Sequence, residues 1–383
     1  MKFAKVNLVS GKRLFYNVVF FLCFFSLFIL NNNRKDPSNL VILNSLLTLF
    51  TLVFIVLLPI GLNYILKWRL SVVHLFLISL LVLSAILCFI SRQYIIVHWL
   101  YLLIYLLILT GDKAIELSKP LKMCVSILCF TSMVVQLFIF DLDGRPVLSY
   151  IDTNYSSMMI FLFGMFCFYK VDKKLAICVL ALGIITLSRA YLLVVFCFVL
   201  LTLLQRNNTI EKMMLYFTKP IVSFLLIVSL PLAINFYFVA NHSVEDLVVN
   251  TAETKLSGSM VDRSNFDRSM ASVMFVTEVI LAPQKYMFGV NLDNYLENIF
   301  RNSPHHSILQ MMLNYGWAFT IPYSLLFFSL ARHACRLNKK LLPFYLSYFI
   351  YLMTLGGGIF GMPVVLLAFI LAKTDDAKNV KQE

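Results

Sequence analysis

Charged residues are scarce in this 383-residue sequence. Asp, Glu, Lys and Arg together make up only 13% of it, while 60% is hydrophobic and the mean hydropathy is +0.85. Soluble domains usually contain about 25% charged residues, so an ordinary soluble domain is excluded. Apolar runs of about 17–25 residues recur from end to end, which is long enough to cross a bilayer as helices. Because these runs are too continuous for alternating barrel strands, we expect an all-α polytopic membrane protein.

Several functional signatures are also missing. The eight cysteines form no Cys-x-x-Cys pair and no metal-ligand spacing, and none falls in a predicted outer loop. The inner loops lack the glycine patterns that hold phosphate, which disfavours a nucleotide-driven pump. The predicted spans contain no acidic residue, which disfavours a proton-coupled transporter. We expect no cofactor and no metal.

Hydropathy predicts about twelve spans and one long outer loop. The spans lie at about 15–31, 40–66, 72–91, 93–111, 123–140, 157–169, 175–188, 190–204, 220–240, 308–331, 341–355 and 359–372. With the N-terminus inside, the inner segments carry 22 of the 32 Lys and Arg residues, so both termini are predicted to be cytoplasmic. This bias explains most of the net charge of +13, which therefore gives no reason to expect nucleic acid. We treat 1–383 as a single integral membrane domain, with 241–306 as its long loop.

Polar residues at the outer ends of spans are candidates for a binding site. Asp152 and Asn154 stand just before the span at 157–169, where they cap the helix, bind a ligand, or do both. Arg189 separates two spans with almost no loop between them. Its planar guanidinium suits bidentate capture of phosphate, and the alternative is an interfacial anchor.

The stretch from Asp262 to Trp317 contains the densest group of such features. Its first twenty residues show apolar side chains at helical spacing, with Arg263 and Arg268 near the start. Pairing with the neighbouring acidic residues is the alternative to ligand binding by these two arginines. Arg301 is the last of the four positive charges in the stretch, and we expect it to contact the same anionic ligand.

Two adjacent histidines follow Pro304 in this stretch. His305 and His306 are expected in the first turn of the span at 308–331, since proline is tolerated near a helix start. The positive potential of a helix start favours an anionic ligand and a neutral imidazole, which can accept a proton. An interfacial pair without chemistry is the alternative.

The order of these features resembles the O-antigen polymerase and O-antigen ligase superfamily. That family has Asp-Pro-Asn before a middle span, a Ser-Arg-small motif, an arginine opening a loop helix, a Pro-containing Gly turn, and a His-Asn run that ends in Gly. The matching segments here are Asp152-Thr153-Asn154, Ser188-Arg189-Ala190, Arg268, Pro283 to Gly289, and PHHSILQMMLNYG. The chain departs from the pattern at Thr153, Asn291 and His306. A longer spacing after the arginine leaves the helix-opening residue open between Arg263 and Arg268.

The resemblance implies a glycosyltransferase-C-like fold and metal-independent glycosyl transfer at the periplasmic face of a bacterial inner membrane. The donor would be an oligosaccharide on undecaprenyl diphosphate, with membrane lipids and a chain-length regulator protein as further partners. The expected catalytic residues are His305 and Arg189. The expected substrate-binding residues are Arg268, Arg263, His306, Asn154, Asp152 and Arg301. We favour a polymerase of repeat units over a ligase to lipid A-core, and a polysaccharide or lipid exporter is the alternative of a different class.

Overall fold

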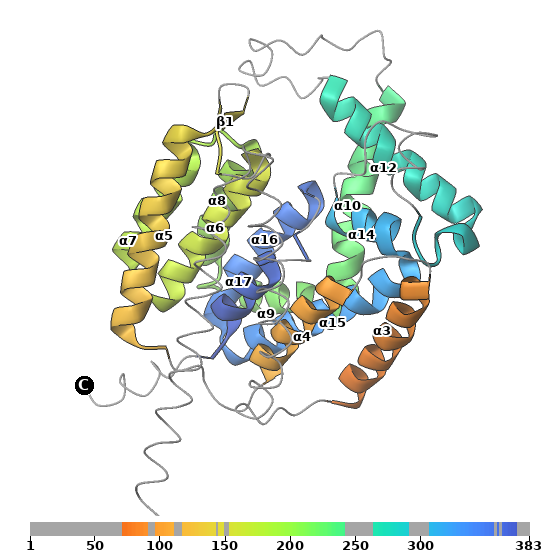
Figure 1. Cartoon of the computed structure of the whole chain (residues 1–383), viewed down its shortest axis with the longest axis horizontal. Helices are drawn as coiled ribbons and strands as arrows, with labels where there is room; N and C mark the ends of the chain where they lie inside the picture. Colours follow the sequence, from red (N-terminus) through yellow and green to blue (C-terminus); the bar gives the residue numbers. More distant parts are fainter. Residues whose placement is uncertain are drawn as a thin grey trace, which may run out of the picture.

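The structure is a computed structural model of the whole chain (Figure 1). It describes residues 71–90, 96–110, 117–142, 145–148, 153–241, 263–290, 306–355, 358–359 and 362–373. The predicted spans at 15–31 and 40–66 lie outside the described residues.

The described part is almost entirely helical, which confirms the all-α prediction. Its α-helices are α3 (Val72–Ile90), α4 (Ile96–Thr110), α5 (Lys119–Ile139), α6 (Thr153–Lys170), α7 (Lys173–Ile184), α8 (Arg189–Leu204), α9 (Asn208–Phe217), α10 (Pro220–Asn241), α12 (Arg263–Leu281), α14 (Ser307–Tyr315), α15 (Trp317–Leu337), α16 (Leu342–Thr354) and α17 (Met362–Leu371). Two short 3-10 helices, η3 (Pro283–Tyr286) and η4 (Lys339–Leu341), and a small hairpin of β1 (Asp141–Leu142) and β2 (Arg145–Pro146) complete it. Each of the ten predicted spans from 72–91 onward coincides with a helix or, at 308–331, with two.

Local chemistry explains where several helices begin. The side chain of Asp172 accepts hydrogen bonds from two backbone N–H groups at the start of α7. The side chain of Asn207 does the same for Thr209 at the start of α9. These caps satisfy donors that have no partner within the helix. Helix α9 lies in a segment predicted only as an inner loop.

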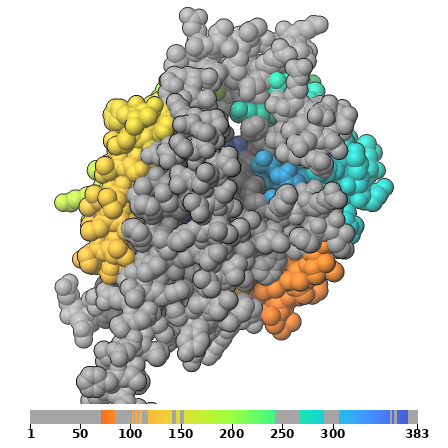
Figure 2. All heavy atoms as spheres, in the orientation of Figure 1, coloured from red at the N-terminus to blue at the C-terminus, as the bar shows by residue number. Residues whose placement is uncertain are grey.

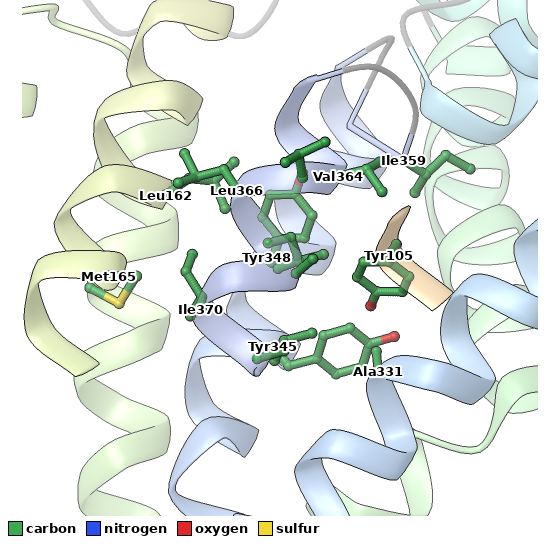
Figure 3. Close-up of a cluster of buried hydrophobic side chains, with 14 of the residues drawn as sticks. Tyr105, Leu162, Met165, Ala331, Tyr345, Tyr348, Ile359, Val364, Leu366 and Ile370 are labelled. Carbon is green, nitrogen blue, oxygen red and sulfur yellow. The ribbon is translucent and has the colours of Figure 1, made fainter. Parts of the chain in front are cut away.

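The core lies between α4, α6, α15, α16 and α17, and it is rich in aromatic rings (Figure 3). Tyr345 and Tyr348 of α16 are fully buried, as is Tyr105 of α4. The ring of Tyr105 stacks on Phe327 of α15 with 5.0 Å between centroids. Buried aromatic side chains of α4, α15 and α16 therefore fill this core.

Within the described residues, two helices, α5 and α10, are long and apolar enough to cross a membrane. Their apolar windows are only 39% and 11% buried, so neither is the buried core helix of the fold. Phe138 and Ile139 of α5 are 85% and 63% exposed, and Tyr237 of α10 is 71% exposed. Figure 2 shows α5 on the outside of the molecule, opposite α12. Exposed apolar surface of this kind is typical of helices that face lipid or another protein.

Segments predicted to lie on the inner side of the membrane meet at one end of the helices. The ammonium group of Lys170 donates to the carbonyl of Ala372 at 2.6 Å and so caps the end of α17. Gln205 donates to the carbonyl of Lys339 at 2.5 Å, and the Lys339 ammonium pairs with Glu211 at 2.5 Å. Each of these contacts joins segments that are far apart in the sequence.

The predicted span at 308–331 is not one helix. Gly316 interrupts it with φ +79°, and α14 and α15 lie on either side of the break. A Cβ at Gly316 would lie 2.1 Å from the carbonyl oxygen of Met287, because the turn that contains Gly289 crosses the break at backbone contact. Val290 N–H donates to the carbonyl of Leu313, and Ala318 N–H donates to that of Met287. Only glycine tolerates both the positive φ and this close approach.

Candidate functional site

The first turns of α6 and α8 are joined by side-chain hydrogen bonds. The hydroxyl of Ser188 donates to Oδ1 of Asn154 at 2.8 Å and accepts from the backbone N–H of Tyr191 at 3.3 Å. Ser188 therefore caps the start of α8 and also links α8 to α6. The hydroxyl of Ser157 lies within hydrogen-bond distance of Ser188 Oγ (3.2 Å) and of the Asn154 carbonyl (2.7 Å). Asn154, predicted as a substrate-binding residue, therefore also holds the start of α8.

Arg189 is the first residue of α8 and is exposed. The turn that delivers it is strained, since Leu187 has φ +50°, the one positive φ among the non-glycine residues of the described part. A left-handed leucine is uncommon and persists only where its surroundings hold it. Here the turn is held by Ser188 and by the Thr186 hydroxyl, which donates to the Gly183 carbonyl at 2.7 Å. The guanidinium is therefore presented from a fixed backbone.

The carboxyl end of α16 connects this corner to the histidine segment. The hydroxyl of Tyr351 donates to Ser157 Oγ at 3.4 Å. One turn later, the carbonyl of Leu355 accepts from the Ser307 hydroxyl at 2.5 Å. Since four helical residues rise about 6 Å, the two contacts are neighbours on α16. The segments of Asn154, Arg189 and His306 thus converge on one helix end.

The loop after α16 packs on the same serine. The N–H of Gly358 donates to Ser307 Oγ at 3.1 Å, and the carbonyl of Gly358 accepts from the Tyr348 hydroxyl at 2.6 Å. The hydroxyl of Tyr323 donates to the carbonyl of Ile359 at 2.8 Å. The sequence predicted only a tight turn at Gly356 to Gly358. Leu355 and Gly358, on either side of the middle of that turn, both contact Ser307 at the start of α14.

His306 uses both ring nitrogens within the protein. It is buried, and its Nδ1 accepts from the backbone N–H groups of Ile308 and Leu309, each at 3.2 Å, which makes it the N-cap of α14. Its Nε2 lies 2.8 Å from the carbonyl oxygen of Ile227 in α10. Because Nδ1 accepts and the carbonyl can only accept, the ring is neutral with its proton on Nε2.

Pro231 explains why a carbonyl in the middle of α10 is available to His306. In an α-helix the carbonyl of residue 227 would accept from the N–H of residue 231, and proline has none. The Nε2–H of His306 supplies the missing donor. We expected the histidine pair at the outer end of a span. His306 lies at the start of α14, where that predicted span begins, and its ring also contacts the carbonyl of Ile227, the eighth residue of α10.

The described part also separates the two arginines of α12. The helix begins at Arg263, and Arg268 lies five residues later, about 140° around it. Arg268 is half-buried and shares its face with Ser272 and Phe275, which are buried. Phe275 packs with Leu309 and Leu313 of α14. Arg268 therefore lies on the face of α12 that packs against α14.

Helix α10 fixes the height of Arg268 relative to His306. The hydroxyl of Ser269, beside Arg268, donates to Oδ1 of Asn235 at 3.1 Å. Asn235 lies eight residues beyond Ile227, which is about 12 Å along the helix. Arg268 is thus two turns closer to the outer end of α10 than His306 is.

Three predicted site residues lie outside the described residues: His305, Asp152 and Arg301. The first two are adjacent in sequence to His306 and Thr153, whose helices are placed. Sequence reasoning missed Ser157, Ser307 and Tyr351, although Ser157 closes the polar run TNYSS that marks the start of α6. Within the placed parts of the chain, no three His, Cys, Asp or Glu side chains gather as metal ligands would.

The turn before Arg189 reaches the end of α16 through Ser157 and Tyr351, and the start of α14 reaches the same end through Ser307. Comparison with known proteins adds no family: no protein-family model, no curated protein and no solved structure matches this chain.

Proposed function

We propose that this chain is a polytopic membrane glycosyltransferase that polymerises a surface polysaccharide. It would join undecaprenyl-diphosphate-linked repeat units at the periplasmic face of a bacterial inner membrane. The observation that carries the proposal is the convergence of the Asn154, Arg189 and His306 segments on the carboxyl end of α16. These segments are the ones whose order resembles the O-antigen polymerase and ligase superfamily.

The meeting points of the helix ends support the proposed topology. The connections predicted inside meet through Lys170, Gln205 and Lys339. The connections predicted outside meet through Asn154 and Ser188. Alternation of chain direction between two faces is what a multi-pass protein with both termini cytoplasmic requires.

Helix lengths support a site that lies within the outer leaflet, below the outer surface of the membrane. Helices α7 and α16 have 12 and 13 residues, so they rise about 18–20 Å, whereas the hydrocarbon layer is about 30 Å thick. Helix α8 rises about 24 Å with its 16 residues. Counted from the inner face, the ends that present Arg189 and the histidine segment would lie inside the outer leaflet. A lipid-borne diphosphate reaches the same depth, where the guanidinium of Arg189 would bind it through paired donors.

The chemistry follows from this placement. Arg189 and Arg268 would bind the diphosphate and stabilise the negative charge that develops on it as it leaves the sugar. His305 would accept the proton of the attacking hydroxyl or orient that hydroxyl. His306 and Ser307 hold the helix start that carries His305.

A ligase is the second candidate, because the ligase members of the superfamily share these motifs. Deletion of the gene in its host, followed by gel separation of the lipopolysaccharide, distinguishes the two. We expect core with a single repeat unit on lipid A, because the attachment step remains and only extension is lost. Lipid A-core without any repeat unit would identify a ligase. An unchanged ladder of long chains would contradict both, and accumulation of finished polymer inside the membrane would favour an exporter.

A further inference from the structure

Five basic side chains gather at the end of the molecule opposite the candidate site. On α15, Arg332, His333 and Arg336 recur at helical spacing with Ser329, so the four share one face. Ser329 Oγ lies 3.0 Å from Nε2 of His74, which places the first turn of α3 against that face. Lys373 follows the end of α17.

These charges are close enough to affect one another. Burial, followed by the positive charges of Lys373 and Arg336, lowers the pKa of His333. Burial and the neighbouring Arg336 likewise lower the pKa of Arg332. The Nε of Arg332 is buried without a hydrogen-bond partner. Neither of the ion pairs found in the described residues involves this cluster, since they join Lys285 to Glu278 and Lys339 to Glu211.

The surface of α3 beside the cluster is apolar and exposed. Val73 and Leu75, which flank His74 around α3, are 62% and 53% exposed, and Leu337 at the end of α15 is 53% exposed. A free inorganic anion would make no favourable contact with these apolar side chains. A phospholipid would contact both groups of side chains, with its phosphate bound by the cations and its acyl chains packed against the apolar residues. Arginine fits phosphate through paired, planar donors.

We propose that the cluster of His74, Arg332, His333, Arg336 and Lys373 binds the headgroup of an anionic phospholipid. The proposal rests on the membrane placement proposed above, but not on glycosyl transfer. In that placement the cluster lies on the inner side, because α15 and α17 end there and α3 begins there. The lipid would fill the corner between α3 and α15 and hold those helices together at their inner ends.

The test measures lipid binding by the full chain in detergent. Native mass spectrometry would follow phosphatidylglycerol and phosphatidylcholine bound to the wild type, to an Arg332→Gln/Arg336→Gln variant and to an Arg206→Gln/Lys212→Gln control. The control removes the same charge from exposed inner residues outside the cluster. We expect the wild type and the control to prefer phosphatidylglycerol, and the cluster variant to bind it roughly thirtyfold more weakly, at about fivefold per cation removed.

Lys373→Gln serves as a milder variant if the double substitution fails to fold, since Lys373 is exposed. It should weaken phosphatidylglycerol binding about fivefold. Equal binding by the cluster variants, the control and the wild type would overturn the proposal. So would equal thermal stabilisation by inorganic phosphate and by phosphatidylglycerol, because the site would then select a free anion. Glycan extension plays no part in these readouts, so failure here would leave the proposed enzyme activity standing.

Discussion

Arg189→Ala is expected to abolish extension of the glycan while leaving the amount of protein unchanged. The guanidinium is exposed at the start of α8, so its loss removes no core packing. Loss of one fixed donor to a developing negative charge costs about 100- to 1,000-fold in rate. Gel analysis of lipopolysaccharide in a deletion host complemented with the variant measures the outcome, with an immunoblot for the protein level.

Two further substitutions separate charge from geometry at this position. Arg189→Lys keeps the charge but offers no planar pair of donors, and we expect it to lose most of the activity. Arg145→Ala removes one positive charge from the hairpin of β1 and β2, where we propose no contact with substrate, and should keep full-length ladders. Long ladders in the Arg189→Ala strain would refute the role of Arg189.

The second large effect is expected at His306 and concerns stability. His306→Ala removes the N-cap of α14, worth about 1 kcal/mol, and leaves the buried carbonyl of Ile227 without a donor, worth about 1–3 kcal/mol. His306→Asn should cost less, because its side chain still caps α14 but cannot reach α10. Denaturant or thermal unfolding in mild detergent measures these differences.

A double-mutant cycle that combines His306→Asn with Pro231→Ala tests the contact between His306 and α10. Alanine at this position restores an N–H that can donate to the Ile227 carbonyl within α10. His306→Asn should therefore be less damaging in the Pro231→Ala background, with a coupling of about 1 kcal/mol. Additive effects of the two changes would contradict the contact between His306 and α10. Loss of activity in His306→Asn without any loss of stability would show instead that the ring touches the substrate, as first predicted.

The sequence predicted the elements of the fold well because hydropathy decides them. Each predicted apolar segment in the described part begins within a few residues of a helix, as α8 illustrates with 190–204 predicted and Arg189–Leu204 found, but α15 continues to Leu337, beyond the predicted end at 331. The break at Gly316 was missed, because apolar residues continue on both sides and nothing local shows that another turn crosses there. Helix α9 was missed because a short amphipathic helix between spans leaves little trace in hydropathy.

Hydropathy also explains why part of the candidate site was predicted. Polar residues at span ends are conspicuous in an apolar chain, so Asn154, Arg189 and His306 could be selected. Their functions within the protein depend on partners that are distant in sequence. No local pattern indicates that Pro231 leaves a carbonyl for His306. The contacts of Tyr351 with Ser157 and of Leu355 with Ser307 likewise join residues that are far apart in the sequence.

Reconstitution tests the central claim most directly. The purified protein in liposomes would be given undecaprenyl-diphosphate-linked repeat units, with EDTA present and no other enzyme, and the products separated by length. We predict longer glycans on the lipid carrier with the wild type and none with His305→Ala or Arg189→Ala. Repeat units that stay single with the wild type, or that move only when lipid A-core is supplied, would contradict a polymerase.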